Sequence, residues 1–129
     1  VFDYFGHLCK ARFDMLQDNV IVDLKTCRDA SPRGFKQSVR NFGYHQQAAF
    51  YLDAAKNSGM TEVDRFQFLA IAKTHPYPYV VYELDAEAIE YGRSLNEQAL
   101  ERLRHCEETG IYTPYNLHNQ IVPIKLTDL

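Results

Sequence analysis

Two acidic side chains and a lysine occupy two short segments near the start of the chain. Arg12-Phe13-Asp14 is followed, beyond an Asp18-Asn19 pair, by Val22-Asp23-Leu24-Lys25. An Asp-Asn loop suits the left-handed dihedrals of a tight hairpin turn. Because side chains alternate along a strand, this hairpin would place Asp14 opposite Asp23, with Lys25 on the same face. Two carboxylates that hold a divalent cation, with an ammonium group beside it, form a site suited to metal-assisted phosphodiester hydrolysis.

The predicted register gives the hairpin one apolar face and one charged face. The opposed pairs are Gln17–Val20, Met15–Val22, Phe13–Leu24 and Asp14–Asp23. The apolar face would carry Ala11, Phe13, Met15, Val20, Val22 and Leu24, and the charged face Lys10, Arg12, Asp14, Asp23 and Lys25. Burial of the apolar face disfavours a slip of one residue, which would mix the two sets. Opposed carboxylates destabilise a sheet unless a proton or a cation lies between them. The alternative is an ordinary solvated face of alternating charge.

Length and composition indicate one modest globular domain, residues 1–129, with 46% hydrophobic residues. No apolar run approaches the ~20 residues of a membrane helix, and no signal peptide opens the chain. Three widely spaced cysteines without a C-x-x-C pair indicate reduced thiols, so we expect a cytoplasmic protein. The start at Val1 rather than Met suggests a fragment that lacks the N-terminal part of its domain, and with it a further ligand.

The net charge of −3 argues against a general polyanion binder, but the charge is unevenly distributed. Residues 10–40 contain seven basic and four acidic side chains, so this segment is +3 and the remainder is −6. A basic region around an acidic pair suits a local phosphate track. A solvated helix face would show the same pattern.

The remaining elements follow from their start and stop signals. Ser31-Pro32 begins a helix, Gly43 interrupts it, and it resumes from Tyr44 to about residue 57, with Gly59 as the stop. Residues 65–73 and 79–84 read as strands, separated by a segment with two prolines. A second long helix over residues 85–106 would end at Gly110 and precede an irregular tail. Its predicted buried face consists of Ile89, Leu95, Ala99, Leu103 and Cys106. This order predicts an α/β fold, with a mixed sheet flanked by helices.

A second motif lies on the helix that begins at Tyr44, where Gln47 and Tyr51 share a face four residues apart. With the hairpin, this motif resembles the PD-(D/E)xK nuclease superfamily, and within it the exonuclease VIII branch of RecE-type prophage recombination exonucleases. The resemblance rests on Cys9-Lys10-Ala11-Arg12-Phe13-Asp14, on Ile21-Val22-Asp23-Leu24-Lys25-Thr26, and on Tyr44-His45-Gln46-Gln47-Ala48-Ala49-Phe50-Tyr51. The last stretch looks like the Q-x-x-x-Y motif of RecB-type nucleases. Two departures are Arg-Phe-Asp in place of Arg-Pro-Asp, and Asp23 rather than Glu in the second motif.

The resemblance implies a restriction-endonuclease-like core and a metal-dependent exodeoxyribonuclease that degrades linear duplex DNA, 5′ to 3′, in recombination. Asp14, Asp23 and the backbone carbonyl of Leu24 would bind Mg²⁺, for which Mn²⁺ would substitute. Lys25 would position or activate the hydrolytic water, and Gln47, Tyr51, Arg12 and Arg28 would position the DNA. The resemblance also implies a ring-shaped homo-oligomer and a single-strand annealing protein as partner.

Two other functions are compatible with the same residues. One is another RecB-type nuclease of the superfamily, such as a helicase-associated domain, a CRISPR adaptation nuclease or a junction resolvase. The other is a non-catalytic DNA-binding or assembly module on the same fold.

Overall fold

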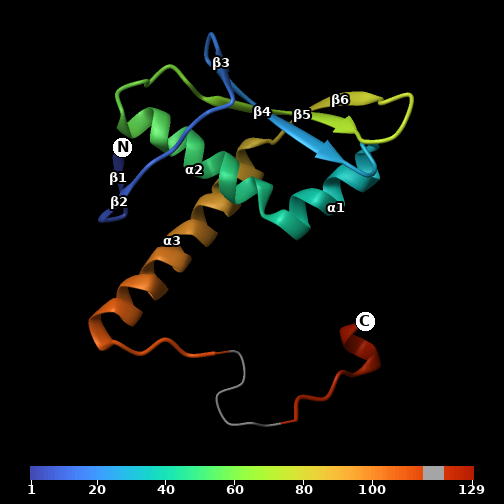
Figure 1. Cartoon of the computed structure of the whole chain (residues 1–129). Coiled ribbons are helices and arrows are strands. Elements are labelled where there is room, and N and C mark those ends of the chain that lie inside the picture. The colour runs from blue at the N-terminus through green and yellow to red at the C-terminus, as the bar shows by residue number, and fades with distance from the viewer. Residues whose placement is uncertain (115–120) are drawn as a thin grey trace.

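A mixed four-stranded sheet, three helices and a separate hairpin make up the chain in the computed structural model, which describes residues 1–114 and 121–129 (Figure 1). The sheet has the order β3-β4-β5-β6, and β1 and β2 form the hairpin. The elements are β1 (Phe2–Tyr4), β2 (His7–Cys9), β3 (Met15–Gln17), β4 (Val20–Cys27), α1 (Pro32–Phe42), α2 (Tyr44–Asn57), β5 (Arg65–Ala72), β6 (Tyr79–Glu83), α3 (Ala86–Thr109) and a 3₁₀ turn η1 (Leu126–Asp128). The predicted α/β class, a mixed sheet flanked by helices, is confirmed.

The helix boundaries form where the local signals predict them. Ser31 caps α1 by accepting a hydrogen bond from the Gly34 N–H, and Pro32 is the first helical residue. Gly43, at φ 65°, ends α1 and precedes α2, because a left-handed residue cannot continue the helix. Asp85 caps α3 in the same way as Ser31 caps α1, and Gly110 ends α3. The part of the predicted irregular tail that falls on residues 115–120 lies outside the described residues.

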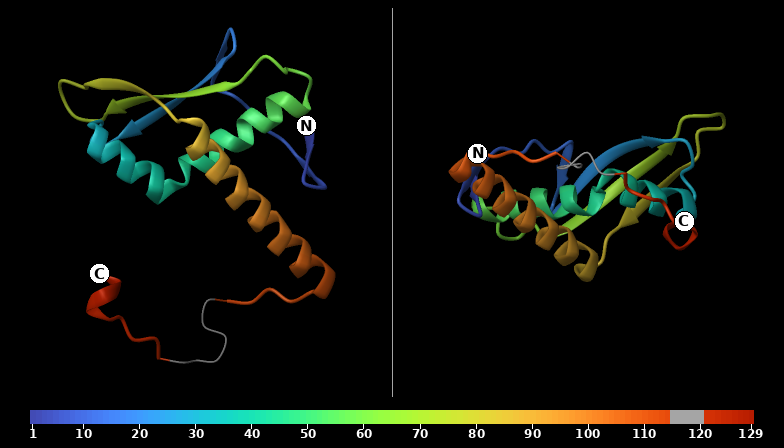
Figure 2. Two further views of the ribbon diagram at one scale, coloured as in Figure 1. Left: turned by 180° about the vertical axis from the view of Figure 1, so that it is seen from behind. Right: turned by 90° about the horizontal axis from the view of Figure 1, so that it is seen from below.

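The helices cover one face of the sheet (Figure 2). The charged side chains of β4 lie on that face, because Lys25 is hydrogen-bonded to Gln47 of α2. Ile21, Asp23 and Cys27 are buried under α1 and α2, with Lys25 half-buried, whereas Leu24 on the opposite face is 51% exposed. The prediction that the apolar face is the buried one was therefore wrong. Both faces of β4 carry apolar residues, so the pattern of that strand alone does not decide which face the helices cover.

The hairpin register is confirmed, but the hairpin is shorter than predicted. Met15 pairs with Val22 and Gln17 with Val20. Residues 10–14 form no strand, and β2 pairs with β1 instead, so Asp14 and Asp23 are not ladder partners. Phe13 packs against the core and the Tyr51 ring rather than on the outer face with Met15.

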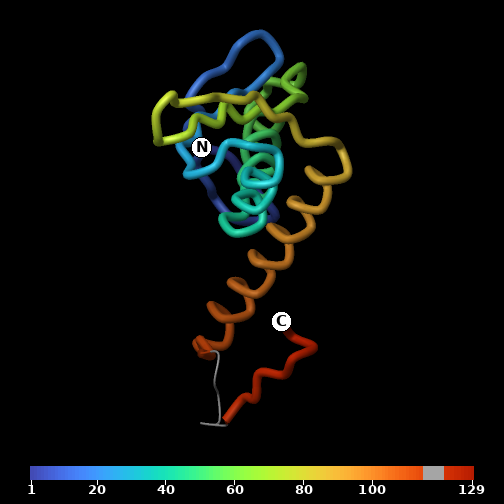
Figure 3. Tube along the Cα trace, turned by 90° about the vertical axis from the view of Figure 1, so that its right-hand side faces the viewer, coloured from blue at the N-terminus to red at the C-terminus, as the bar shows by residue number. Residues whose placement is uncertain are grey.

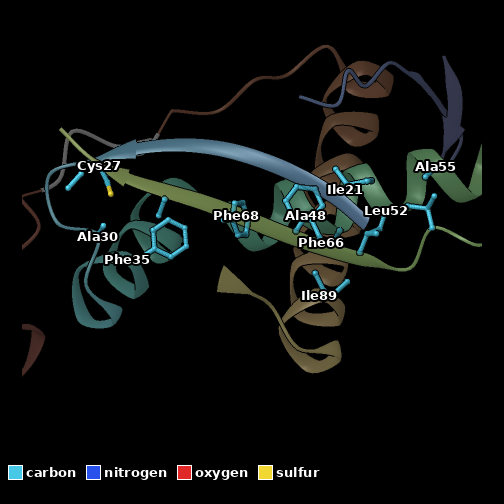
Figure 4. Close-up of a cluster of buried hydrophobic side chains, with 14 residues drawn as sticks. Ile21, Cys27, Ala30, Phe35, Ala48, Leu52, Ala55, Phe66, Phe68 and Ile89 are labelled. Atoms are coloured by element: carbon cyan, nitrogen blue, oxygen red, sulfur yellow. The ribbon is translucent and has the colours of Figure 1, made fainter. Parts of the chain in front are cut away.

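Phenylalanines of β5 and alanines of α2 form the core between the sheet and the helices (Figure 4). Phe66 and Phe68 are fully buried and their ring centroids lie 5.0 Å apart. Ala48 and Ala55 are completely buried, and their small side chains let α2 approach β4 and β5 closely. The result is a rigid contact between α2 and the charged face of β4.

Helix α3 packs against α2 along its first half and extends beyond the sheet in its second (Figure 3). At Gly92 an added Cβ would lie 2.1 Å from the His45 carbonyl oxygen, so the two helices meet where only glycine fits. Ile89 is buried as predicted, but Ala99 and Leu103 are exposed. That part of the predicted buried face was wrong, because the second half of α3 packs Leu100, and not Ala99 or Leu103, against the cluster of Phe2, Tyr4 and Ala54.

The helices of the described residues include none that is both long and apolar enough to span a membrane.

Candidate active site

Asp23 and Lys25 form an ion pair on the inner face of β4. Asp23 is 3% exposed, and its Oδ2 lies 2.7 Å from Lys25 Nζ. The two residues are two apart in a strand, so the pleat points both side chains toward the helices. The site thus joins a buried carboxylate to an ammonium group.

Asp14 approaches the same site from the segment before β3. Its Oδ2 accepts a hydrogen bond of 2.9 Å from the Leu24 N–H, at the position where β3 no longer pairs with β4. The carboxylate therefore takes the place of a backbone partner at this edge of the sheet. It also interacts with Asp23, because the Asp14 charge contributes to the raised pKa of Asp23. The predicted convergence of the two acids occurs, but through a bend rather than a ladder pair.

Burial raises the pKa of Asp23 above its ordinary value, and Asp14 raises it further, whereas Lys25 lowers it. Among the described residues no hydrogen bond of acceptable geometry reaches Asp23 Oδ2, despite its short contact with Lys25. A buried carboxylate oxygen without a hydrogen bond is costly unless another group compensates its charge. The Lys25 ammonium, 2.7 Å from Oδ2, is the group that compensates this charge.

Gln47 on α2 bridges both members of the ion pair. Its Oε1 accepts a hydrogen bond of 2.8 Å from Lys25 Nζ, and its Nε2 donates one of 3.3 Å to Asp23 Oδ1. Gln47 therefore fixes the ammonium group and the carboxylate relative to each other. Its predicted contact with DNA stays a prediction.

The other members of the α2 motif face the site at helical spacing. The Tyr44 ring lies 4.4 Å from Lys25 Nζ, a cation–π contact that the site prediction did not include. The sequence signal for this contact was the position of Tyr44 three residues before Gln47, which places both side chains on the same face of α2. The Tyr51 ring packs against Phe13 and Phe66, at centroid distances of 5.5 and 6.1 Å, so it also supports the wall of the site.

Arg12 and Arg28 are exposed and lie in segments that border the site. Arg12 lines a cavity together with Asp14 and Leu24, and Arg28 follows directly after the end of β4. These positions leave both guanidinium groups accessible to a ligand, and their predicted role in positioning DNA stays a prediction.

The donor set suits a hard divalent cation. Asp14 and Asp23 supply carboxylate oxygens, and Mg²⁺ commonly takes one or two carboxylates together with water and phosphate oxygens. Asp23 Oδ2 is already paired with Lys25 Nζ at 2.7 Å, so a cation bound by Asp23 would share this carboxylate with the lysine. Residues 1–114 and 121–129 contain no group of three His, Cys, Asp or Glu side chains suited to a metal, and the role of Asp14 and Asp23 as metal ligands stays a prediction. A contribution of the Leu24 carbonyl stays a prediction.

The fold and the site together define a class of protein. It is a mixed α/β domain in which two carboxylates converge beside a lysine. The family model described as "PDDEXK-like domain of unknown function (DUF3799)" matches residues 1–115, so the chain belongs to this PDDEXK-like family. Membership of the PD-(D/E)xK superfamily is thereby confirmed, whereas the exonuclease VIII branch stays a prediction.

One solved structure has the same fold over nearly the whole chain. It is the crystal structure of a protein from Eubacterium rectale described as a "putative exonuclease", with a TM-score of 0.72 and 20% sequence identity. The match covers 98% of this chain and 53% of that one, so the chain spans about half the length of this structural relative. None of the curated proteins compared matches the chain.

Proposed function

We propose that this domain is a metal-dependent nuclease that hydrolyses phosphodiester bonds of DNA. The observation that carries the proposal is the buried Asp23 carboxylate, which is paired with Lys25 at 2.7 Å and approached by Asp14. Membership of the PDDEXK-like family and the fold of the Eubacterium rectale protein support it.

Each residue has a part that its position supports. Asp14 and Asp23 would hold Mg²⁺ or Mn²⁺, which polarises the scissile phosphate and lowers the pKa of a bound water. Lys25 Nζ orients the attacking water and stabilises negative charge that develops on the phosphate. Gln47 holds the Lys25 and Asp23 side chains in a fixed relative position, and the Tyr44 ring limits the movement of the ammonium group.

Within this class we propose an exodeoxyribonuclease that acts on linear duplex DNA, 5′ to 3′, in recombination, as part of a ring-shaped homo-oligomer that works with an annealing protein. The sequence resemblance to exonuclease VIII supports this finer assignment. A cytoplasmic location fits this role.

The test is a comparison of variants on labelled DNA. With Mg²⁺, wild-type protein should shorten a linear duplex labelled at its 3′ ends and leave a closed circle intact. Lys25→Ala and Asp23→Asn should each lose at least about 100-fold in rate, because each removes a charge from the transition state. Lys56→Ala and Glu62→Gln, which change exposed charges away from the site, are the matched controls.

Equal activity in folded Lys25→Ala and Asp23→Asn proteins would remove these residues from the mechanism. Cleavage of the closed circle would instead assign an endonuclease of the same superfamily.

A non-catalytic DNA-binding module is the second candidate, since only two acidic side chains converge in the described part of the chain. It predicts binding of DNA without turnover at any Mg²⁺ or Mn²⁺ concentration.

A further inference from the structure

A cavity of about 680 Å³ borders the candidate active site at the end of β4. Its volume lies within the range of small-ligand sites. It is lined by polar and aromatic side chains from β4, α1 and the end of β5, among them Thr26, Arg28, Asn41, Phe42, Tyr44 and Lys73. The Tyr44 ring lines the cavity and contacts Lys25 Nζ, so the cavity adjoins the candidate reacting groups.

Phe42 presents an exposed ring at one side of this cavity. It is the last residue of α1 and is 69% exposed. Its ring stacks on Tyr44, with centroids 5.7 Å apart and planes 29° apart, and Tyr44 stacks in turn on buried Phe68 at 5.5 Å. Phe42 is therefore the outermost ring of a stack that is anchored in the core and touches Lys25 through Tyr44.

Two basic side chains line the same cavity. Arg28 and Lys73 line it, and Lys73 is held in place by a backbone hydrogen bond to the Cys27 carbonyl oxygen. Asp29 also lines it; hydrogen bonds with the Ser31 side chain and N–H lower the pKa of Asp29, so its carboxylate stays charged and offsets one of the two cations. Helix α1 adds three exposed basic side chains and no acidic one; they are Arg33, Lys36 and Arg40. An anionic ligand is favoured here.

An aromatic face beside basic groups matches the chemistry of a nucleotide. Unpaired bases stack on exposed aromatic rings while Lys and Arg neutralise the backbone phosphates. A base inside a duplex has both faces covered by its neighbours, so it cannot stack on a protein ring unless it leaves the helix.

We propose that this cavity binds one unpaired nucleotide of a DNA strand, with its base stacked on Phe42 and its phosphate beside Arg28 and Lys73. The proposal rests on the nuclease function proposed above and adds that the strand entering the site is single-stranded at this point. The short path from Phe42 through Tyr44 to Lys25 places such a nucleotide next to the phosphodiester bond that would be cut.

The test is DNA binding without turnover, in EDTA, by the whole chain at one fixed salt concentration. The probe is a fluorescein-labelled oligothymidine strand, compared with a blunt duplex of the same length. Phe42→Ala should weaken binding of the single strand about 5-fold or more, because base–aromatic stacking contributes roughly 1–3 kcal/mol. Phe42→Trp should retain the affinity, and binding of the blunt duplex should change less than about 2-fold.

Tyr79→Ala is the matched control, because Tyr79 is also 69% exposed but lies on β6, away from this cavity. It should leave binding of the single strand unchanged. A strand that contains one 2-aminopurine gives a second readout, since stacking of this base on Phe42 should quench its fluorescence with wild-type protein and not with Phe42→Ala.

Unchanged affinity for the single strand in Phe42→Ala would overturn the proposal, as would equal weakening for strand and duplex. These readouts need no cleavage, so they are independent of the Lys25 and Asp23 rate measurements. If Phe42→Ala binds the single strand like wild type, the nucleotide site is removed, whereas the nuclease assignment is removed if wild-type protein cleaves no DNA with Mg²⁺ or Mn²⁺.

Discussion

At the scale of single residues, Asp23 is the central charged group of the candidate site. Its carboxylate is nearly inaccessible, its pKa is raised by burial, and Lys25 is its nearest compensating charge. An aspartate in this environment gains from a second cation, because Asp14 adds negative charge close by. We therefore propose that a divalent cation bound at this site would stabilise the folded protein.

Binding of Mn²⁺ should stabilise the wild-type protein. At a concentration about 100 times the dissociation constant, binding to the folded state alone adds roughly 2.7 kcal/mol, which corresponds to a rise in Tm on the order of 10 °C for a domain of this size. Asp23→Asn should show little of this rise, and Asp64→Asn, an exposed control, should show all of it. A Tm of wild-type protein that does not respond to Mn²⁺ would contradict a metal site.

The pH dependence of stability without metal follows from the raised pKa of Asp23. The folded state binds the proton more tightly than the unfolded state, so the free energy of unfolding should fall as pH rises from the ordinary pKa of aspartate through the raised one. Asp23→Asn cannot ionise and should lose less stability over that window. Denaturant unfolding between pH 4 and 7 measures the difference, and parallel profiles for the two proteins would contradict it.

At the scale of elements, a buried cluster joins β1, α2 and α3. Asp53 on α2 is 8% exposed and accepts two hydrogen bonds from Arg93 Nε, at 2.9 and 3.1 Å, and one of 2.7 Å from Arg93 Nη2. The Tyr4 hydroxyl donates a further hydrogen bond of 2.9 Å, and burial raises the pKa of Tyr4 to about 12. This cluster fixes α2, and with it Gln47, relative to its neighbours.

Arg93→Ala should destabilise the protein by about 2–4 kcal/mol, because it leaves the Asp53 charge buried without its main partner. Arg104→Ala removes an exposed ion pair with Glu101 on the same helix and should change stability by less than about 0.5 kcal/mol. Denaturant unfolding compares the two. Addition of Asp53→Asn to Arg93→Ala should recover part of the loss, and an equal loss in both single variants would contradict the role of the cluster.

Local sequence signals predicted where the helices begin and end. They did not predict which face of β4 the helices cover. Ser31-Pro32, Gly43 and Asp85 act on backbone groups within a few residues, so their sequence context was sufficient. The covered face of β4 depends on how α1 and α2 cross the sheet between β4 and β5. That contact joins residues more than twenty positions apart, such as Lys25 and Gln47.

At the scale of the whole molecule, the charge is concentrated where the site lies. Residues 10–40 carry seven basic and four acidic side chains, in a chain whose net charge is −3. A polyanion would thus be attracted to this region and repelled by the remainder.

Binding of DNA should depend on salt through helix α1. The logarithm of the association constant should fall linearly with the logarithm of salt concentration, with a slope set by the number of phosphates neutralised. The triple variant Arg33→Gln, Lys36→Gln and Arg40→Gln should reduce that slope by about 2–3 if all three side chains contact phosphates. Arg102→Gln with Arg104→Gln, on the far part of α3, should leave it unchanged. Equal slopes for wild type and the α1 variant would contradict the phosphate track.

The sequence by itself determined the residue types of the site, the Met15–Val22 register and the approximate ends of the helices and of β4 to β6, because these depend on neighbours in the chain. It did not predict the β1–β2 hairpin or the short β3. Only the tertiary structure decided that the charged face of β4 is the covered one, that Asp14 reaches the site through the Leu24 N–H, and that Gln47 bridges Asp23 and Lys25. Both faces of β4 carry enough apolar surface to pack, so the buried face is determined by the helices that cross the sheet.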